Sequence, residues 1–222
     1  MLTFLDTERF MKMEIFDISV LTSSGIPVWP NTPGFQLSRS LDQQNGDEVT
    51  SSTITTDVHC GTHIDAPLHF IVGAEDATKI DLEKCIGPAF VGDFTGVSEI
   101  TPELLEARVP LGVERLLLKT DNSQLWPRSE FYKDFTALTE DAAAWVCKRK
   151  IKLVGIDYLS IQLFSGDART HTDLMRAGVV ILESIDLSKI SEGFYYLVCL
   201  PLSIEGAEAV PARAVLMPLN QI

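Results

Sequence analysis

The second half of the chain alternates between short apolar runs and segments in which apolar residues recur at helical spacing. Thr101 followed by Pro102 and Glu103 offers an N-cap, a first-turn proline and an acid near the helix N-terminus. Residues 139–150 carry acids at their start and bases at their end, which indicates another helix. The pattern therefore predicts helices from residue 101, over 139–150 and over 172–177, and strands over 115–120, 151–157, 179–184, 195–202 and 213–219.

In the first half of the chain, proline and glycine residues interrupt the predicted strands. Residues 15–20 alternate like a strand, and residues 25–34 form a turn-rich loop that holds Trp29 among prolines. A polar loop is expected over residues 43–48, followed by a strand over 49–57. Strands separated by helices imply a mixed β-sheet with packed helices, the α/β class. No repeat or linker-like composition shift divides the chain, so residues 1–222 are expected to form a single domain.

One short stretch concentrates the chemistry, because three of the four histidines lie between residues 59 and 69. His59, His63, Asp65 and His69 all occupy odd-numbered positions. Successive side chains of a strand alternate between its faces, so an extended chain would present all four on one side. A helix would turn Asp65 roughly to the opposite side from His59. The spacing therefore predicts a strand that carries candidate metal ligands.

The glycine and the proline within this stretch predict that the strand bends. Fully extended, its two ends would lie about 33 Å apart at about 3.3 Å per residue. The side chains can meet only if the chain turns near Gly61 or Pro67. Cys60 occupies an even position and is expected to face away from the ligands, as a packed small side chain.

Two residues elsewhere can complete a metal site. His171 follows the predicted strand 151–157 in an expected loop, near the edge where α/β proteins place their sites. Glu183 ends an apolar run, where a buried carboxylate is costly unless it is paired or bound to a cation. Imidazole and carboxylate ligands with open coordination positions are typical of catalytic metal sites. They suit Zn²⁺, Mn²⁺ or Fe²⁺, and one or two ions are compatible with the set.

Charge and composition narrow the set of partners. With 18 basic and 31 acidic residues, the formal net charge is -13, which repels phosphate backbones and anionic lipid. Apolar runs fall far short of the roughly 20 residues of a membrane helix, and acids interrupt the first 16 residues, unlike a signal peptide. The four scattered cysteines lack a C-x-x-C pair and indicate reduced thiols. We expect a cytoplasmic protein that binds neither nucleic acid nor membrane.

The stretch from His59 to Phe70, written His-x-Gly-Thr-His-x-Asp-x-Pro-x-His-Phe, resembles the signature of the cyclase family of metal-dependent hydrolases. This family includes bacterial kynurenine formamidase and isatin hydrolase. The resemblance extends to residues 26–30, 153–157 and 211–216. It implies a swivelling β/β/α fold, a homodimer or homotetramer, and an acid/base role for His69. It also implies that Zn²⁺ or Mn²⁺ is held by His59, His63, Asp65, His171 and Glu183.

The resemblance further implies that water activated by the metal attacks an amide carbon. The substrate would be an arylformamide such as N-formylkynurenine, in tryptophan catabolism, or a cyclic amide such as isatin. Formamidases tend to carry Pro-Ser-x-Asp after the central strand, whereas this chain has Tyr158-Leu159-Ser160-Ile161, which leaves the substrate open. Ser160 is a candidate hydrogen-bonding partner of the substrate. Trp29 is expected either to stack on a flat aromatic substrate or to pack in the core or at a dimer interface.

Other interpretations fit the same residues. The site could hydrolyse a lactone or another cyclic ester, or the chain could be a non-catalytic metal-binding or ligand-binding protein of the same fold. His69 could be a further metal ligand or a brace instead of the acid/base residue. Cys60 could act as a nucleophile beside a histidine, although its even position opposes this hypothesis.

Overall fold

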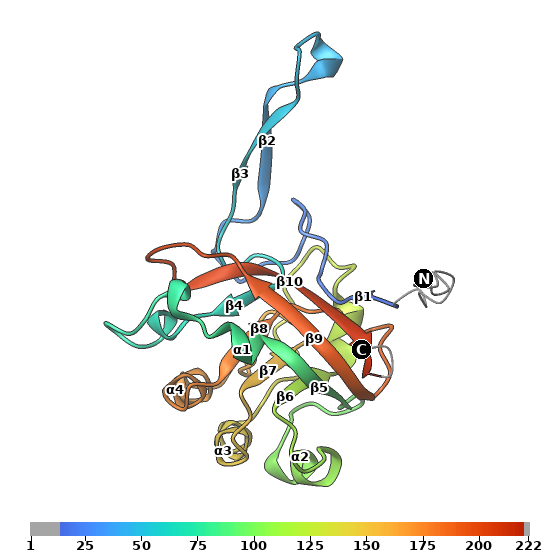
Figure 1. Ribbon diagram of the computed structural model, residues 1–222, viewed down its shortest axis with the longest axis vertical. Coiled ribbons are helices and arrows are strands. Elements are labelled where there is room, and N and C mark those ends of the chain that lie inside the picture. The colour runs from blue at the N-terminus through green and yellow to red at the C-terminus, as the bar shows by residue number, and fades with distance from the viewer. Residues whose placement is uncertain (1–13, 220–222) are drawn as a thin grey trace, which may run out of the picture.

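The computed structural model describes residues 14–219, which are built around a closed, mixed β-sheet (Figure 1). The strands of the closed sheet are, in chain order, β4 (His63–Asp65), β5 (Ile86–Asp93), β6 (Arg115–Lys119), β7 (Leu153–Ile156), β8 (Val180–Glu183), β9 (Gly193–Pro201) and β10 (Ala209–Pro218). They pair in the ring β4-β8-β7-β6-β5-β9-β10, and β10 returns to β4. The pairs from β5 to β8 are parallel and the other pairs of the ring are antiparallel. The α/β class with a mixed sheet is confirmed.

Three helices lie along one side of the barrel (Figure 1). They are α2 (Pro102–Arg108), α3 (Glu140–Lys148) and α4 (Arg169–Arg176), and a short α1 (Leu82–Cys85) precedes β5. The hydroxyls of Thr101 and Thr139 accept hydrogen bonds from backbone N–H groups of α2 and α3, as their N-cap positions predict. The third helix begins at Arg169 and not at residue 172. His171 therefore lies in a helix, and its expected loop position was wrong.

Side chains of the parallel strands alternate between two apolar cores. Leu117 of β6 and Leu153 of β7 belong to the core inside the barrel. Leu116 and Val154, their neighbours in sequence, belong to the core beneath the helices. Each of these four side chains is buried. Burial on both faces explains why these strands are almost continuously apolar in sequence.

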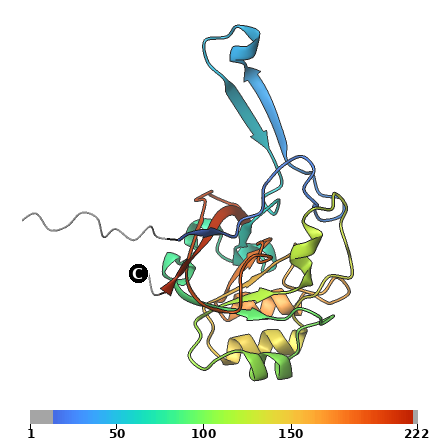
Figure 2. The ribbon, with the colours of Figure 1, turned by 90° about the vertical axis from the view of Figure 1, so that its right-hand side faces the viewer.

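A two-stranded ribbon projects far from the barrel (Figures 1 and 2). It consists of β2 (Gln36–Leu41) and β3 (Ser51–Thr55), which pair antiparallel, and every residue of both strands is exposed. We call residues 36–55 the arm. The sequence pattern predicted a strand over 49–57 but missed β2, because serine and glutamine positions give β2 the composition of a loop. It also missed β5, whose glycines and proline resemble turn residues.

The strand expected over residues 15–20 is shorter in the structure. It consists of β1 (Phe16–Asp17), which pairs with β10, and an isolated bridge between Ser19 and Ile185. Between residues 14 and 219, no helix combines the length and the apolar character needed to cross a membrane. Residues 1–13, most of the segment considered for a signal peptide, lie outside the described residues.

Asp157, directly after β7, links the carboxyl ends of β6 and β7. Its carboxylate accepts hydrogen bonds from the backbone N–H and the hydroxyl of both Thr120 and Ser123, at 2.7–3.2 Å. Burial raises the pKa of Asp157 to about 6, although the hydrogen bonds oppose the shift. The carboxyl ends of β6 and β7 are thus held together immediately before Leu159 and Ser160, which line a cavity.

Candidate metal centre

β4 and β8 present their polar side chains on the same face of the sheet. Ile64 and Leu182 belong to the core inside the barrel. Alternation then turns His63 and Asp65 away from that core, toward the helix layer. Glu183 pairs with His63 across the two antiparallel strands and shares this face. The structure therefore places His63 and Asp65 on one face, as their odd-numbered positions predict, and adds Glu183 to them.

The chain bends on both sides of β4. Gly61 has a φ of 79°, and a Cβ at this position would lie 2.5 Å from Oγ1 of Thr22, so the turn requires glycine. Pro67 begins a 3₁₀ helix, Pro67–His69. The rings of His59 and His69 consequently lie 4.2 Å apart between centroids. The bends were predicted, but the expected strand over 59–69 was wrong, because only His63–Asp65 form a strand.

Four buried side chains bring nitrogen and oxygen atoms that can bind a metal close together beneath these two bends. Nε2 of His63 lies 3.4 Å from Oδ1 of Asp65 and 3.4 Å from Oε2 of Glu183. Nε2 of His171, from α4, lies 3.1 Å from Oε1 of Glu183 and 3.7 Å from Oδ2 of Asp65. Residues far apart in sequence thus form one compact group of imidazoles and carboxylates.

His59 and His69 extend this group toward the surface. Nδ1 of His59 lies 3.2 Å from Oδ1 of Asp65. Ligand atoms of His59, Asp65 and His69 all lie within 4.8 Å of one another, and so do those of His63, Asp65 and Glu183. The geometry is therefore compatible with His69 as either an acid/base residue or a further ligand.

Several buried atoms of the cluster have no hydrogen-bond partner among residues 14–219. They are Nε2 of His59, Nε2 of His63 and both carboxylate oxygens of Asp65. Buried polar atoms are nearly always paired, and unpaired buried carboxylate oxygens are especially costly. A divalent cation would satisfy Nε2 of His63 and the oxygens of Asp65 together, and these nitrogen and oxygen ligands match its preferences. The residues present therefore fit a metal ion.

The surroundings of His63 favour positive charge. Its Nδ1 donates a hydrogen bond to the carbonyl oxygen of Gly61 at 2.8 Å, which directs Nε2 toward the carboxylates. Burial alone lowers the pKa of His63, but its contacts with Asp65 and Glu183 outweigh burial and raise the pKa to about 10. The paired carboxylates thus attract a proton to this position and would attract a metal ion more strongly.

His69 is electrostatically different from His63. It is partly buried, and burial lowers its pKa although Asp65 opposes the shift. The ring is therefore neutral at pH 7 and can accept a proton. It also packs edge-on against Phe70, with 4.4 Å between ring centroids.

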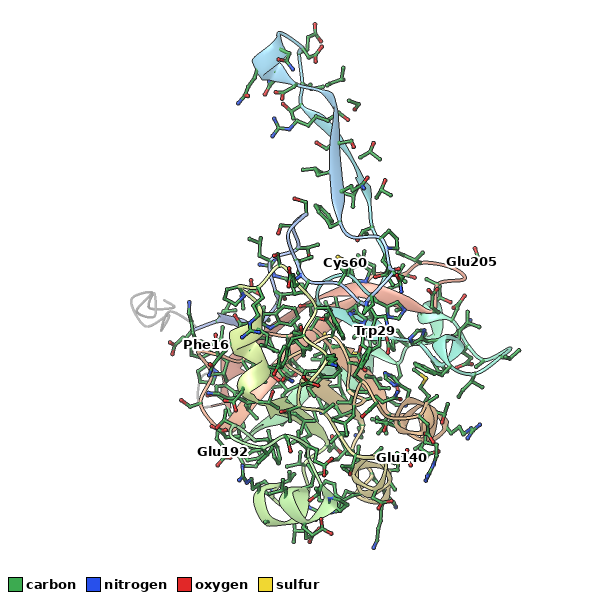
Figure 3. All side chains as sticks on the ribbon, turned by 180° about the vertical axis from the view of Figure 1, so that it is seen from behind. Phe16, Trp29, Cys60, Glu140, Glu192 and Glu205 are labelled. Carbon is green, nitrogen blue, oxygen red and sulfur yellow. The ribbon has the colours of Figure 1, made fainter. Side chains whose placement is uncertain are left out.

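A cavity of about 240 Å³ opens beside the cluster. It is lined by His59, His69, His171 and Glu183, together with Trp29, Thr32, Asp57, Phe70, Leu159, Ser160 and Gln162. Trp29 and Ser160, the two predicted substrate-binding residues, both contribute to the lining. Trp29 lies on the body beneath the base of the arm (Figure 3) and packs against Phe131 at 5.1 Å between ring centroids. One side of the cavity is therefore aromatic.

Sequence reasoning missed Thr32, Asp57, Leu159 and Gln162 as lining residues. Asp57 and Gln162 are polar and lie within two residues of predicted site residues. Their closeness in sequence to His59 and Ser160 is the signal by which they could have been found. Their side-chain directions depend on the turns around them, which residue spacing does not determine.

Comparisons with known proteins identify relatives of the whole chain. The model of the family described as "Putative cyclase" matches residues 16–162. A kynurenine formamidase of Bacillus mycoides (strain KBAB4) is 34% identical over 204 residues, which cover 91% of this chain and 97% of that protein. A solved structure described as a potential metal-dependent hydrolase with cyclase activity has a TM-score of 0.81 and 35% identity, with 92% of this chain and 98% of that one covered.

A more distant structure extends the comparison of the fold. Isatin hydrolase A from Ralstonia solanacearum has a TM-score of 0.78 at 20% identity, with 93% of this chain and 92% of that one covered. At this identity the likeness shows a common fold and nothing more. With a matching family model over most of its length and relatives above 30% identity, the chain belongs to the cyclase family.

Proposed function

We propose that this protein is a metal-dependent hydrolase that cleaves the C–N amide bond of a small aromatic amide, with an arylformamide such as N-formylkynurenine as the preferred substrate. The observation that carries the proposal is the buried cluster of unpaired imidazole and carboxylate atoms, which opens into a cavity with an aromatic side. The likeness to a kynurenine formamidase supports the choice of a formamide, in a step of tryptophan catabolism.

We assign the metal to a set of five ligands: His59, His63, Asp65, His171 and Glu183. Zn²⁺ and Mn²⁺ both suit these ligands, and the set would hold one or two ions. Such a cation lowers the pKa of water toward about 7 and polarises a carbonyl group. The protein's own part is to hold this charge in a buried position next to the substrate cavity.

His69 is placed to transfer the proton. It lines the cavity and is neutral at pH 7, so it can take a proton from the attacking water. As the bond from the water oxygen to the carbonyl carbon forms and the C–N bond breaks, the same proton passes to the leaving nitrogen. Trp29 and Phe70 offer apolar surfaces for an aryl ring. Ser160 accepts a hydrogen bond from the backbone N–H of Gln162, which leaves its own hydrogen for the substrate.

Two other substrate classes use the same chemistry. A cyclic amide such as isatin and a lactone both present a carbonyl carbon to the attacking water, and only the leaving atom differs between amide and ester. A non-catalytic binding protein would keep the metal without turnover.

Substrate assays on metal-defined protein test the proposal. We expect N-formylkynurenine to be hydrolysed with a kcat/KM at least about 100-fold above those of isatin and a simple lactone, a difference of about 2.7 kcal/mol in transition-state binding. We also expect chelators to abolish the activity and iodoacetamide to leave it unchanged, because Cys60 is a buried thiol. Turnover of none of the three substrates by metal-loaded protein would contradict the proposal.

We propose in addition that the chain forms a homodimer or homotetramer through the arm. Leu37 and Ile54 lie opposite each other on the arm and are 54% and 60% exposed. Leu41, which follows a register shift in β2, is 41% exposed. An isolated two-stranded ribbon is marginally stable in water, so apolar cover from a second copy would stabilise it. The cytoplasmic location and the lack of nucleic-acid or membrane partners stay predictions.

Polar substitution on the arm tests the assembly. We expect Leu37→Ser combined with Ile54→Ser to shift the protein to monomers in size-exclusion chromatography with light scattering. Ser38→Ala with Thr53→Ala alters the neighbouring cross-strand pair on the opposite face and should leave the assembly unchanged. An unchanged molecular mass in the Leu37 and Ile54 double variant would count against the arm as the interface.

A further inference from the structure

We infer that Gln162 is the positioning residue that fixes the ring of His171 for cation binding, an inference that rests on the proposed function. Nδ1 of His171 lies 3.1 Å from Oε1 of Gln162. Nε2 of the same glutamine donates to the carbonyl oxygen of Gly166 at 3.4 Å. A carbonyl oxygen can only accept, so this contact assigns the amide nitrogen to Gly166 and the amide oxygen to His171.

This orientation determines which nitrogen of His171 is available to a metal ion. An amide oxygen cannot donate, so Nδ1 carries a hydrogen, and Nε2 on the other side of the ring is the nitrogen whose lone pair can bind a cation. That nitrogen lies 3.1 Å from Oε1 of Glu183 and 3.7 Å from Oδ2 of Asp65. A lone pair directed at two carboxylates is repulsive unless positive charge lies among them. Gln162 therefore selects the form of His171 that binds a metal.

His63 obtains the same orientation in another way. Its Nδ1 donates to the backbone carbonyl of Gly61. Both buried histidines thus direct Nε2 toward the carboxylates, one through a backbone oxygen and the other through a side-chain oxygen. Only the side-chain oxygen, on Gln162, can be removed by substitution without changing the backbone.

The choice of an amide also fits the charge of the site. Metal-bound histidines commonly donate their second N–H to a carboxylate or a backbone carbonyl. Here Asp65 and Glu183 already supply two buried negative charges, which balance one divalent cation. A neutral acceptor at Gln162 orients the ring without adding a third negative charge.

Gln162 also connects the metal ligand to the wall of the cavity. The carbonyl oxygen of Gly166 accepts the Nε2 hydrogen of Gln162, and the N–H of Gly166 closes a turn by donating to the carbonyl oxygen of Leu163. This turn carries Phe164, whose ring packs against Trp29 at 5.5 Å between centroids. The same amide thus holds both the ring of His171 and one part of the aromatic side of the cavity.

Metal titration of apo-protein variants tests the inference directly. Gln162→Met keeps the length of the side chain and removes the strong acceptor, whereas Gln162→Glu keeps an acceptor oxygen. We expect the Met variant to bind Zn²⁺ about 10- to 100-fold more weakly in competition with a chromophoric chelator, and its Co²⁺ complex to have an altered visible spectrum. We expect Gln162→Glu to stay within about threefold of the wild type. Gln124→Met, at an exposed glutamine, is the matched control and should bind like the wild type.

The outcomes separate this inference from the proposed function. A folded Met variant that binds Zn²⁺ within about twofold of the wild type, with the same Co²⁺ spectrum, overturns the role of Gln162 and leaves the metal site standing. If circular dichroism shows that the Met variant is unfolded, the Glu variant decides, and a loss of about 10-fold or more in that folded variant overturns the role. A wild-type protein that binds no divalent cation overturns the proposed function and this inference with it.

Discussion

Replacing His63 with alanine is expected to remove metal retention and turnover together. His63 is fully buried, and its Nε2 lies 3.4 Å from a carboxylate oxygen of both Asp65 and Glu183. Without the imidazole the two carboxylates lose the group between them, and the remaining donors no longer enclose a cation. Loss of a partner outside the ligand set already costs about 10- to 100-fold in affinity or activity, so we expect a loss above about 100-fold here. Elemental analysis and steady-state kinetics measure both effects.

The adjacent residue provides the control for this experiment. Ile64→Val alters a side chain on the opposite face of β4, inside the barrel core, and should cost about 1 kcal/mol of stability without loss of metal. His63→Ala protein that is folded and carries a full complement of metal would contradict the assignment of His63 as a ligand. Folded protein without metal and without turnover is the expected result.

The alternation of side chains in β4 shows how much of the site the sequence could predict. Odd-numbered positions place His63 and Asp65 on one face, and Gly61 and Pro67 mark the two turns that bring His59 and His69 back toward them. These features are local, because they depend on residue spacing and on backbone conformation. Short-range physical rules were therefore sufficient for them.

Glu183 and His171 were predicted on different grounds. A carboxylate at the end of an apolar strand is costly without a partner, which made Glu183 a candidate before its pairing with His63 was known. The helical position of His171 was missed, since the N-cap residue of α4 is Ala168, and the carboxylate that accepts from the N–H of Arg169 belongs to Asp167, one residue earlier. The ligands themselves were thus easier to predict than the elements that carry them.

The remaining parts of the structure depend on contacts that residue spacing does not encode. β2 is exposed along its whole length, and its two leucines, Leu37 and Leu41, are separated by polar residues, so no period-2 hydrophobic pattern marks it as a strand. The position of Gln162 beside His171 requires the turn to Gly166 and the packing of α4 against β8. Such features follow from tertiary packing, and the relevant residues are visible only after the chain is folded.

Replacing His69 with alanine is expected to leave the metal in place and to remove most of the rate. His69 lines the cavity, and its ring is neutral at pH 7 because burial lowers its pKa. General acid–base catalysis by a positioned side chain contributes about 10² to 10⁴ in rate, so kcat should fall by this factor. Elemental analysis of the variant should show the same metal content as the wild type, and circular dichroism should show the same fold.

The pairing of these two measurements decides between the roles that the geometry permits for His69. Its ligand atom lies within 4.8 Å of those of His59 and Asp65, close enough for a shared ion. If metal is lost together with the rate, His69 belongs among the ligands, and proton transfer must be assigned to another group of the cavity. If the metal is retained and the rate stays near that of the wild type, His69 has neither role. If the variant keeps its metal but reacts slowly, proton transfer is assigned to His69. Only a residue that is not a metal ligand can be replaced without loss of the ion.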